Sequence, residues 1–295
     1  MIEGRAAKET RSRIPLICML VGVCLFWQTP PAVAEEILLE MPNGLTARAE
    51  YSRGNDDRPV VLILHGFLQT YEFPTVARLA NSLREEGLTV LTPSLTLGID
   101  NRNQSLSCEA IHKHNMHEDS EELRAWVSWL HAQTGKPVTL IGHSIGSLNL
   151  LGLMQEPPRE SVERLVLISL LSLDEDTIMA STKESYERAL ENLERGKLGL
   201  ANYSLSFCER YPSEVEDFLS YRSWTSEKTT RVLNSLDVPA YVILGSRDDR
   251  MSAGWRSKVS QTSAQVILVE GAGHFFDTQY EFDLLDEVLA VTGSN

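Results

Sequence analysis

Residues 138–146 read VTLIGHSIG, and this stretch decides the fold. Its first half is apolar and rich in β-branched residues, as expected of a strand buried on both faces of a parallel sheet. Its second half places Ser144 between Gly142 and Gly146, directly before an apolar helical stretch at residues 147–154. A serine in so tight a turn lies in strained backbone, and the glycines remove side chains that would clash. We therefore predict that Ser144 is a nucleophile held above the sheet.

The alternative for this stretch is a glycine-rich strand-to-helix turn without chemistry. A short pattern of two glycines around a serine arises by chance in some chains of this length. The expected strand before Ser144 and the expected helix after it favour the catalytic interpretation. The N-terminus of that helix would also stabilise negative charge that develops beside the serine.

A serine hydroxyl needs a general base, and His274 is the candidate. It ends the glycine-rich segment 271–274, which follows an apolar run at residues 266–269. A histidine in such a loop, at the carboxyl end of a strand, can reach the sheet edge where Ser144 is expected. The alternative is an ordinary histidine of a surface loop.

The base needs an acid to orient it, and two carboxylates follow the apolar run at residues 241–244. Asp248 stands three positions after Gly245, the spacing that usually positions this group, and Asp249 is the alternative. The order along the chain is then serine, aspartate, histidine, which differs from the orders in chymotrypsin and subtilisin.

A tetrahedral intermediate also needs donors for its oxyanion. The backbone N–H of Ile145 follows the nucleophile, and the N–H of Phe67, or less favourably of Leu68, follows the strand at residues 60–64. We expect His65 to brace this loop and to transfer no proton.

The rest of the chain alternates between strand and helix patterns, which indicates a parallel sheet covered on both faces. Residues 42–44, PNG, predict a hairpin turn before this alternation starts. Segment 172–237 breaks the rhythm because it is charged and mostly helical in pattern, so we interpret it as an insertion over the core. The expected strands are 37–40, 45–51, 60–64, 89–91, 138–141, 165–168, 241–244 and 266–269, and the clearest helices are 74–86, 118–133, 184–194 and 279–291.

Segments 64–67, 142–146, 245–248 and 273–274 together resemble the α/β-hydrolase superfamily, of the serine esterase and lipase type. This resemblance implies the α/β-hydrolase fold: a mostly parallel, eight-stranded sheet with helices on both faces and a helical cap insertion. It implies cleavage of a carboxylic ester, from a small molecule or a lipid, through an acyl-enzyme and without a cofactor. The same three side chains could serve an amidase, a peptidase or a thioesterase, and a catalytically silent binding protein is a further alternative.

The N-terminus has the pattern of a secretory signal peptide. Basic residues precede an apolar run at residues 14–27, and the small residues of segment 32–34 form a cleavage site. This run is shorter than the roughly 18 residues that span a bilayer, so we expect no stable membrane anchor after cleavage. The predicted organisation is a signal peptide at 1–34, a hydrolase core at 35–171 and 238–295, and a cap at 172–237, in a periplasmic or secreted protein.

Of the four cysteines, Cys18 and Cys24 fall in the signal segment. The remaining pair, Cys108 and Cys208, favours a disulfide in an exported protein, and the alternative is two free thiols.

The net charge of −14 opposes binding to nucleic acid or to an anionic membrane. A metal site is also not expected. The three histidines of segment 112–117 do not have a common zinc spacing, and we interpret this segment as a polar loop beside the pocket.

Overall fold

The structure of this chain is a computed structural model that describes residues 1, 4, 34–156, 158, 161–174 and 181–293. The chain divides into two units, Met1–Pro30 and Pro31–Asn295, and the fold below is that of the second unit. Nearly all of the predicted signal peptide lies outside the described residues. In the described part of the chain, no helix has both the length and the hydropathy needed to cross a bilayer.

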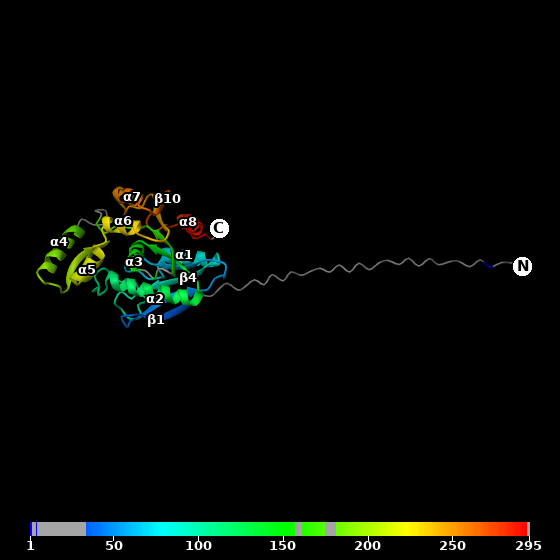
Figure 1. The fold of residues 1–295 in the computed structure, drawn as a ribbon, viewed down its shortest axis with the longest axis horizontal. Coiled ribbons are helices and arrows are strands. Elements are labelled where there is room, and N and C mark those ends of the chain that lie inside the picture. Colours follow the sequence, from blue (N-terminus) through cyan, green and yellow to red (C-terminus); the bar gives the residue numbers. More distant parts are fainter. Residues whose placement is uncertain (2–3, 5–33, 157, 159–160, 175–180, 294–295) are drawn as a thin grey trace. The chain divides into compact units, whose positions relative to one another are not determined.

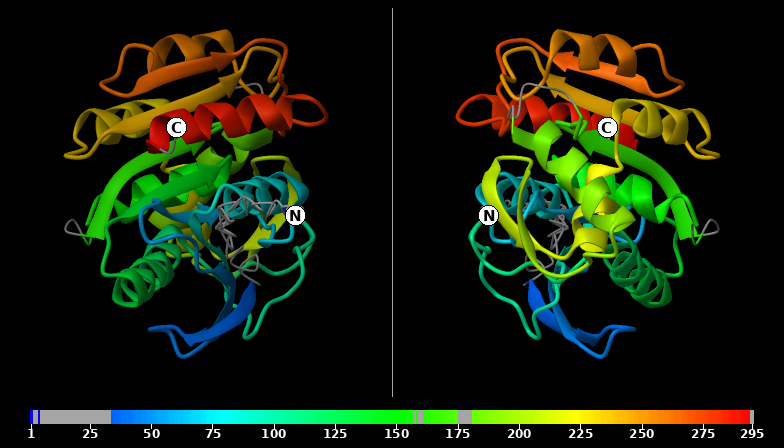
Figure 2. Two further views of the ribbon diagram at one scale, coloured as in Figure 1. Left: turned by 90° about the vertical axis from the view of Figure 1, so that its right-hand side faces the viewer. Right: turned by 90° about the vertical axis from the view of Figure 1, so that its left-hand side faces the viewer.

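An eight-stranded sheet forms the centre of this unit, in the order β1-β2-β4-β3-β5-β6-β9-β10. Every neighbouring pair from β4 to β10 is parallel, and β2 is antiparallel to both β1 and β4. Figure 2 shows the two ends of this twisted sheet, with β1 and β2 in blue and β10 in orange. The strands are β1 Glu35–Glu40, β2 Thr46–Ser52, β3 Val60–Leu64, β4 Thr89–Ser94, β5 Val138–His143, β6 Val162–Ile168, β9 Ala240–Gly245 and β10 Gln265–Val269.

Helices cover both faces of the sheet (Figure 1). Side chains alternate across a strand, so Leu62 and Leu64 of β3 pack into one core cluster while Val61 and Ile63 pack into the other. The first cluster includes α2 and α3, and the second includes α1 and α8. The bounds of these helices and of α7 are α1 Pro74–Glu85, α2 Met116–Thr134, α3 Ile145–Leu153, α7 Ala253–Val259 and α8 Tyr280–Thr292. The predicted α/β-hydrolase fold, with a mostly parallel eight-stranded sheet, is thus confirmed.

The helix ends follow from local sequence. The side chain of Asn115 caps α2 by accepting a hydrogen bond of 3.0 Å from the N–H of Glu118, a role for which asparagine is a preferred residue. Gly135 ends the same helix in the left-handed conformation, at φ 67°. These two signals set the ends of α2, which packs against α3.

Between β6 and β9 the chain forms helices and one hairpin. The helices are α4 Ser181–Glu194, α5 Val215–Arg222 and α6 Ser226–Asn234, and the hairpin pairs β7 Ala201–Leu205 with β8 Cys208–Ser213. The mostly helical pattern of this segment agrees with the helices, but the sequence analysis did not predict the hairpin. Its turn at Ser206 and Phe207 carries neither glycine nor asparagine, and Ser206 adopts φ 54° without that signal.

Candidate active site

The nucleophile turn has the strained backbone that its sequence predicts. Ser144 lies between β5 and α3 at φ 57° and ψ −123°, a conformation that residues other than glycine rarely adopt. A Cβ at Gly146 would lie 2.3 Å from the carbonyl oxygen of His65, and one at Gly142 would lie 2.8 Å from the backbone of Ser147. Both positions therefore require glycine, because no larger residue leaves room for the turn.

Three of the predicted site residues form one hydrogen-bonded chain. Ser144 Oγ lies 3.0 Å from Nε2 of His274, and Nδ1 of His274 lies 2.8 Å from Oδ2 of Asp248. Because a carboxylate only accepts, Nδ1 carries the hydrogen, and Nε2 can accept the serine proton. All three side chains are buried. The structure thus brings together residues that are 130 positions apart in the chain.

The two candidate carboxylates lie in different surroundings. Asp248 is buried and also accepts a hydrogen bond of 3.0 Å from the N–H of Arg250, whereas Asp249 is exposed. The loops after β9 and β10 are in tight contact, because a Cβ at Gly245 would lie 2.3 Å from the carbonyl oxygen of Ala272. This close approach sets Asp248 opposite His274.

Two residues that the sequence analysis did not assign hold the backbone of His274. Its carbonyl oxygen accepts hydrogen bonds of 3.0 Å from Nε2 of His143 and 2.8 Å from Oγ of Ser169. Burial lowers the pKa of His143 to about 3, so its ring is neutral and donates through Nε2. His143 belongs to the quoted motif, but no local pattern reveals that its ring reaches residue 274.

The loop after β3 is braced by two buried side chains. Nδ1 of His65 donates to the carbonyl oxygen of Gly66 at 2.7 Å, and Nε2 accepts from the N–H of Leu95 at 3.2 Å. Arg102, which the sequence analysis missed, donates to the carbonyl oxygens of Leu95 and Gln69, at 2.8 Å each. Burial is the main cause that lowers the pKa of His65 to about 3, so its ring is neutral. His65 therefore has the bracing contacts expected of it.

The two predicted oxyanion donors flank the nucleophile turn. In the described part of the chain, neither the N–H of Phe67 nor that of Ile145 takes part in a loop or turn hydrogen bond to backbone. Leu68, the alternative, lies in the left-handed region at φ 60°. Gly146 packs against the carbonyl of His65, so the loop and the start of α3 are in direct contact. These contacts bring the loop that carries Phe67 up to the start of α3, where Ile145 lies.

A disulfide joins Cys108 to Cys208, as predicted. It links the loop before α2 to the first residue of β8, across a sequence separation of 100 residues. Aromatic contacts strengthen this link, because the Phe67 ring lies 5.6 Å from the Tyr211 ring and 6.2 Å from the Tyr221 ring, measured between centroids. The inserted segment thus packs directly on the loop that carries Phe67.

The histidines of segment 112–117 are divided between the interior and the surface. His112 is buried, with its ring stacked 3.9 Å from that of Tyr211, and His114 is buried beside Tyr221, while His117 is exposed. Within the described ranges, no group of three or more histidine, cysteine or acidic side chains could hold a metal ion. The two buried rings pack against the inserted segment.

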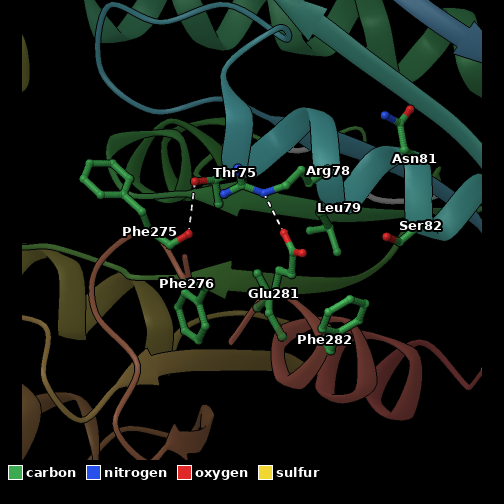
Figure 3. Close-up of a pocket in the computed structure, with 10 residues that line it drawn as sticks. Thr75, Arg78, Leu79, Asn81, Ser82, Phe275, Phe276, Glu281 and Phe282 are labelled. Carbon is green, nitrogen blue, oxygen red and sulfur yellow. Dashed lines mark hydrogen bonds and ion pairs between the residues drawn. The ribbon is translucent and has the colours of Figure 1, made fainter. Parts of the chain in front are cut away.

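A groove of about 180 Å³ lies between α1 and α8, beside the histidine loop (Figure 3). The hydroxyl of Thr75 donates to the carbonyl oxygen of Phe275 at 3.1 Å, and Nε of Arg78 lies 2.8 Å from Oε2 of Glu281. None of Ser144, Asp248 and His274 lines this groove. Its contacts hold the loop that follows His274 and the start of α8 against α1.

Several solved structures are similar to this protein over almost the whole of their own chains. Est1E from Butyrivibrio proteoclasticus matches at 15% identity and a TM-score of 0.61, covering 89% of this chain and 99% of its own. The esterase domain from a Rhodothermus marinus protein matches at 17% identity and a TM-score of 0.58, covering 89% and 98%. A thioesterase domain from the curacin biosynthetic pathway matches at 17% identity and a TM-score of 0.57, covering 89% and 100%. At these identities the likeness shows the fold.

No curated protein matches the sequence significantly. The sequence does match the model of the alpha/beta hydrolase family, over residues 60–282. This range contains Phe67, Ser144, Asp248 and His274 and covers most of the sheet. The chain therefore belongs to the α/β hydrolase family.

Proposed function

We propose that this protein is a serine hydrolase that cleaves a carboxylic ester through an acyl-enzyme intermediate. The observation that carries the proposal is the continuous chain from Ser144 Oγ to His274 Nε2, at 3.0 Å, and from His274 Nδ1 to Asp248 Oδ2, at 2.8 Å. These contacts lie within the range that proton transfer between nucleophile and base requires. The strained backbone of Ser144 adds support, since strain of this kind is concentrated at functional sites.

In the first half of the reaction, Ser144 Oγ attacks the carbonyl carbon of the ester, and its proton passes to Nε2 of His274. The carbonyl oxygen becomes an oxyanion, to which the N–H groups of Phe67 and Ile145 donate. The tetrahedral intermediate then breaks its bond to the leaving alcohol, which takes the proton from Nε2. Ser144 is left as an acyl ester.

In the second half, water loses a proton to Nε2 of His274 and attacks the acyl carbonyl. Breakdown of this second intermediate releases the carboxylic acid and returns the proton to Ser144. Asp248 keeps Nδ1 of His274 protonated throughout and stabilises the imidazolium that forms. These steps need no cofactor and no metal.

A thioesterase is the second candidate, because a thioester would react through the same groups. The thioesterase domain among the similar structures favours this candidate over an amidase. An ester has the further support of the esterase domain from Rhodothermus marinus. Matched oxygen and sulfur esters of one acyl group would distinguish these two activities.

We also propose that the mature protein begins after residue 34 and is exported, and that segment 172–237 acts as a cap. The disulfide between Cys108 and Cys208 supports an oxidising compartment. The aromatic contacts of Phe67 with Tyr211 and Tyr221 support the role of the segment as a cap, because they link it to the loop that carries Phe67. N-terminal sequencing of protein recovered from the culture medium or the periplasm tests the cleavage site.

The nucleophile is tested with a fluorophosphonate probe and the Ser144→Ala variant. The probe should label wild-type protein once, at Ser144, and the variant should lower kcat on any hydrolysed ester by about 10⁶-fold. Ser147→Ala is the matched control, because Ser147 is a buried serine three positions away, on α3, whose hydroxyl donates to the carbonyl oxygens of Gly142 and Ile168. Equal labelling of wild type and Ser144→Ala would refute the proposed function.

A further inference from the structure

Two buried side chains from neighbouring strands hold the carbonyl oxygen of His274. Nε2 of His143 donates to this oxygen at 3.0 Å, and Oγ of Ser169 donates to it at 2.8 Å. His143 is the last residue of β5, and Ser169 directly follows β6, which runs parallel to β5. Both side chains belong to residues that are at most 1% exposed. We call His143 and Ser169 together the carbonyl clamp.

The backbone that carries the clamp also carries Ser144. His143 directly precedes Ser144 in the chain. Ile168 directly precedes Ser169, and its carbonyl oxygen accepts a hydrogen bond of 2.8 Å from the N–H of Ser144. The backbone of His274 is therefore linked to the backbone of Ser144 along two short paths, one through each clamp residue. Both paths are independent of the contact between Ser144 Oγ and His274 Nε2.

Ser169 has strained backbone, as Ser144 does. Its φ is 50°, in the left-handed region that residues other than glycine rarely adopt, and its N–H donates to the carbonyl oxygen of Ile243 at 2.9 Å. Strain of this kind is concentrated at functional sites, where the surrounding structure enforces it. The ends of β5 and β6 thus each lead into a strained serine. One is the proposed nucleophile, and the other donates to the backbone of the proposed base.

The ring of His143 is held so that Nε2 remains a donor. Nδ1 has no hydrogen-bond partner among the described residues, and a Cβ at Gly66 would lie 3.4 Å from it. A hydrogen on Nδ1 would be an unpaired buried donor, which is costly, so the hydrogen stays on Nε2. Burial is the main cause that lowers the pKa of His143 to about 3, and positive charge on His274 lowers it further. His143 therefore stays neutral while His274 gains and loses its proton.

We propose that His143 and Ser169 are positioning residues that keep Nε2 of His274 within reach of Ser144 Oγ during turnover. This inference rests on the proposed function. Nε2 must take a proton from Ser144 and give it to the leaving group, and both transfers require hydrogen-bond distance. Asp248 restrains the ring of His274, and the clamp restrains its backbone. A displacement of about 1 Å would lower the rate by about 10²-fold.

The first test removes each donor and measures kcat and KM separately on 4-nitrophenyl acetate. His143→Leu should lower kcat by about 10²-fold, and Ser169→Ala, which removes one hydrogen bond, by about 5- to 10-fold. KM should change little, because both clamp side chains are buried. His143→Gln places an amide N–H near the position of Nε2 and should recover most of kcat. Wild-type kcat in folded His143→Leu and Ser169→Ala overturns the inference.

His131→Leu and Ser120→Ala are the matched controls. Nδ1 of His131 lies 2.8 Å from the carbonyl oxygen of Lys136, and Oγ of Ser120 donates to the carbonyl oxygen of Met116 at 2.7 Å. Each control therefore removes a side chain that contacts a backbone carbonyl away from the loop of His274. Both controls should keep wild-type kcat. A loss in these controls as large as in the clamp variants would also overturn the inference.

The second test uses His274→Ala, which keeps the carbonyl group at position 274 and removes the imidazole. This variant should keep a small residual activity, because the oxyanion donors remain. Adding His143→Leu should not lower the residual rate further, since the clamp then has no base to position. A loss of the same factor in both backgrounds would mean that His143 acts on Ser144 or on the structure in general, and would contradict a role through His274.

The two proposals fail in different ways. If no ester is hydrolysed and the fluorophosphonate probe leaves Ser144 unlabelled, the proposed function fails. If esters are hydrolysed at Ser144 and the clamp variants keep wild-type kcat, only the inference about His143 and Ser169 fails. Should His143→Leu not fold, Ser169→Ala still decides, because a wild-type kcat in that variant overturns the inference and a loss of kcat at unchanged KM supports it.

Discussion

Asp248 and Asp119 are buried carboxylates that lie near histidines, and the two arrangements differ in two respects. Asp248 contacts His274 directly, with 2.8 Å between Oδ2 and Nδ1. Asp119 is separated from His114 by the hydroxyl of Tyr221, and its closest ion-pair distance to that ring is 3.8 Å. The first chain ends on a serine hydroxyl, and the second ends on the phenol of Tyr211.

This difference separates the proposed catalytic chain from a chain of fixed hydrogen bonds. In the first chain we propose that the carboxylate stabilises positive charge on His274, whose Nε2 lies 3.0 Å from Oγ of Ser144 in strained backbone. In the second chain the phenols of Tyr211 and Tyr221 have pKa values raised well above 10, mainly by burial, so they donate without ionising. A fixed set of donors leaves one oxygen of Asp119 as an acceptor. The same residue types therefore form a candidate proton relay in one region and a static hydrogen-bond network in the other.

The largest effect should come from the carboxylate of the first chain. Asp248→Asn should lower kcat by about 10⁴-fold for every substrate, because an amide cannot stabilise the protonated His274. Asp249→Asn is the matched control and should change kcat little, since Asp249 is exposed. Steady-state kinetics on one ester checks both variants. A large loss in Asp249→Asn with full activity in Asp248→Asn would reverse the assignment.

Reduction of the disulfide should have a smaller effect than Asp248→Asn, and this effect should arise from the second chain, which contains Tyr211 and Tyr221. Tyr211 and Tyr221 lie in the segment that Cys208 ties to Cys108, and both rings contact Phe67, so reduction should alter KM. Closing a loop of about 100 residues contributes at most about 4.7 kcal/mol to the free energy of unfolding. Urea unfolding with and without reductant measures this change.

The double variant Cys108→Ser with Cys208→Ser is the control for the disulfide, because it should not respond to reductant. Unfolding midpoints and KM values that are the same in oxidised and reduced wild type would contradict the expectation.

The smallest effect concerns the pH dependence of stability that arises from His143, whose ring donates to the carbonyl oxygen of His274. The pKa of His143 falls from 6.5 to about 3 on folding, mainly through burial, so the unfolded chain binds a proton that the folded protein does not. The contribution of His143 to the free energy of unfolding is therefore fully present above pH 6.5. It falls as the pH drops toward 3, by about 1.4 kcal/mol per pH unit. His143→Gln should reduce that slope.

Urea unfolding at several pH values between 7 and 4 checks the change in slope. The exposed His117, replaced by glutamine, is the matched control. An unchanged slope in His143→Gln would mean that this ring does not stay neutral in the folded protein.

The sequence predicts the chain from Ser144 to Asp248 better than the chain from Asp119 to Tyr211. The turn at Ser144 and the loops of Asp248 and His274 have local signals, namely a strand followed by glycine and one reactive residue. The strand and helix alternation predicts the sheet for the same reason. The hairpin β7–β8 was missed because its turn lacks glycine and asparagine.

The chain from Asp119 to Tyr211 could not be predicted, because it joins residues 102 and 107 positions apart through tertiary packing. His143 and Ser169 illustrate the same limit. Their hydrogen bonds to the carbonyl of His274 cross 131 and 105 positions, respectively. Nothing in the adjacent sequence distinguishes these side chains from ordinary buried polar residues.

The central claim is that Ser144 carries the acyl group during turnover. The most direct measurement mixes the protein rapidly with 4-nitrophenyl acetate, follows the release of 4-nitrophenol, and maps the quenched protein by mass spectrometry. We expect a burst of one equivalent per protein and an acetyl group on the peptide that contains Ser144, absent in Ser144→Ala. Turnover with no covalent acetyl group, or with the acetyl group on another residue, would contradict it.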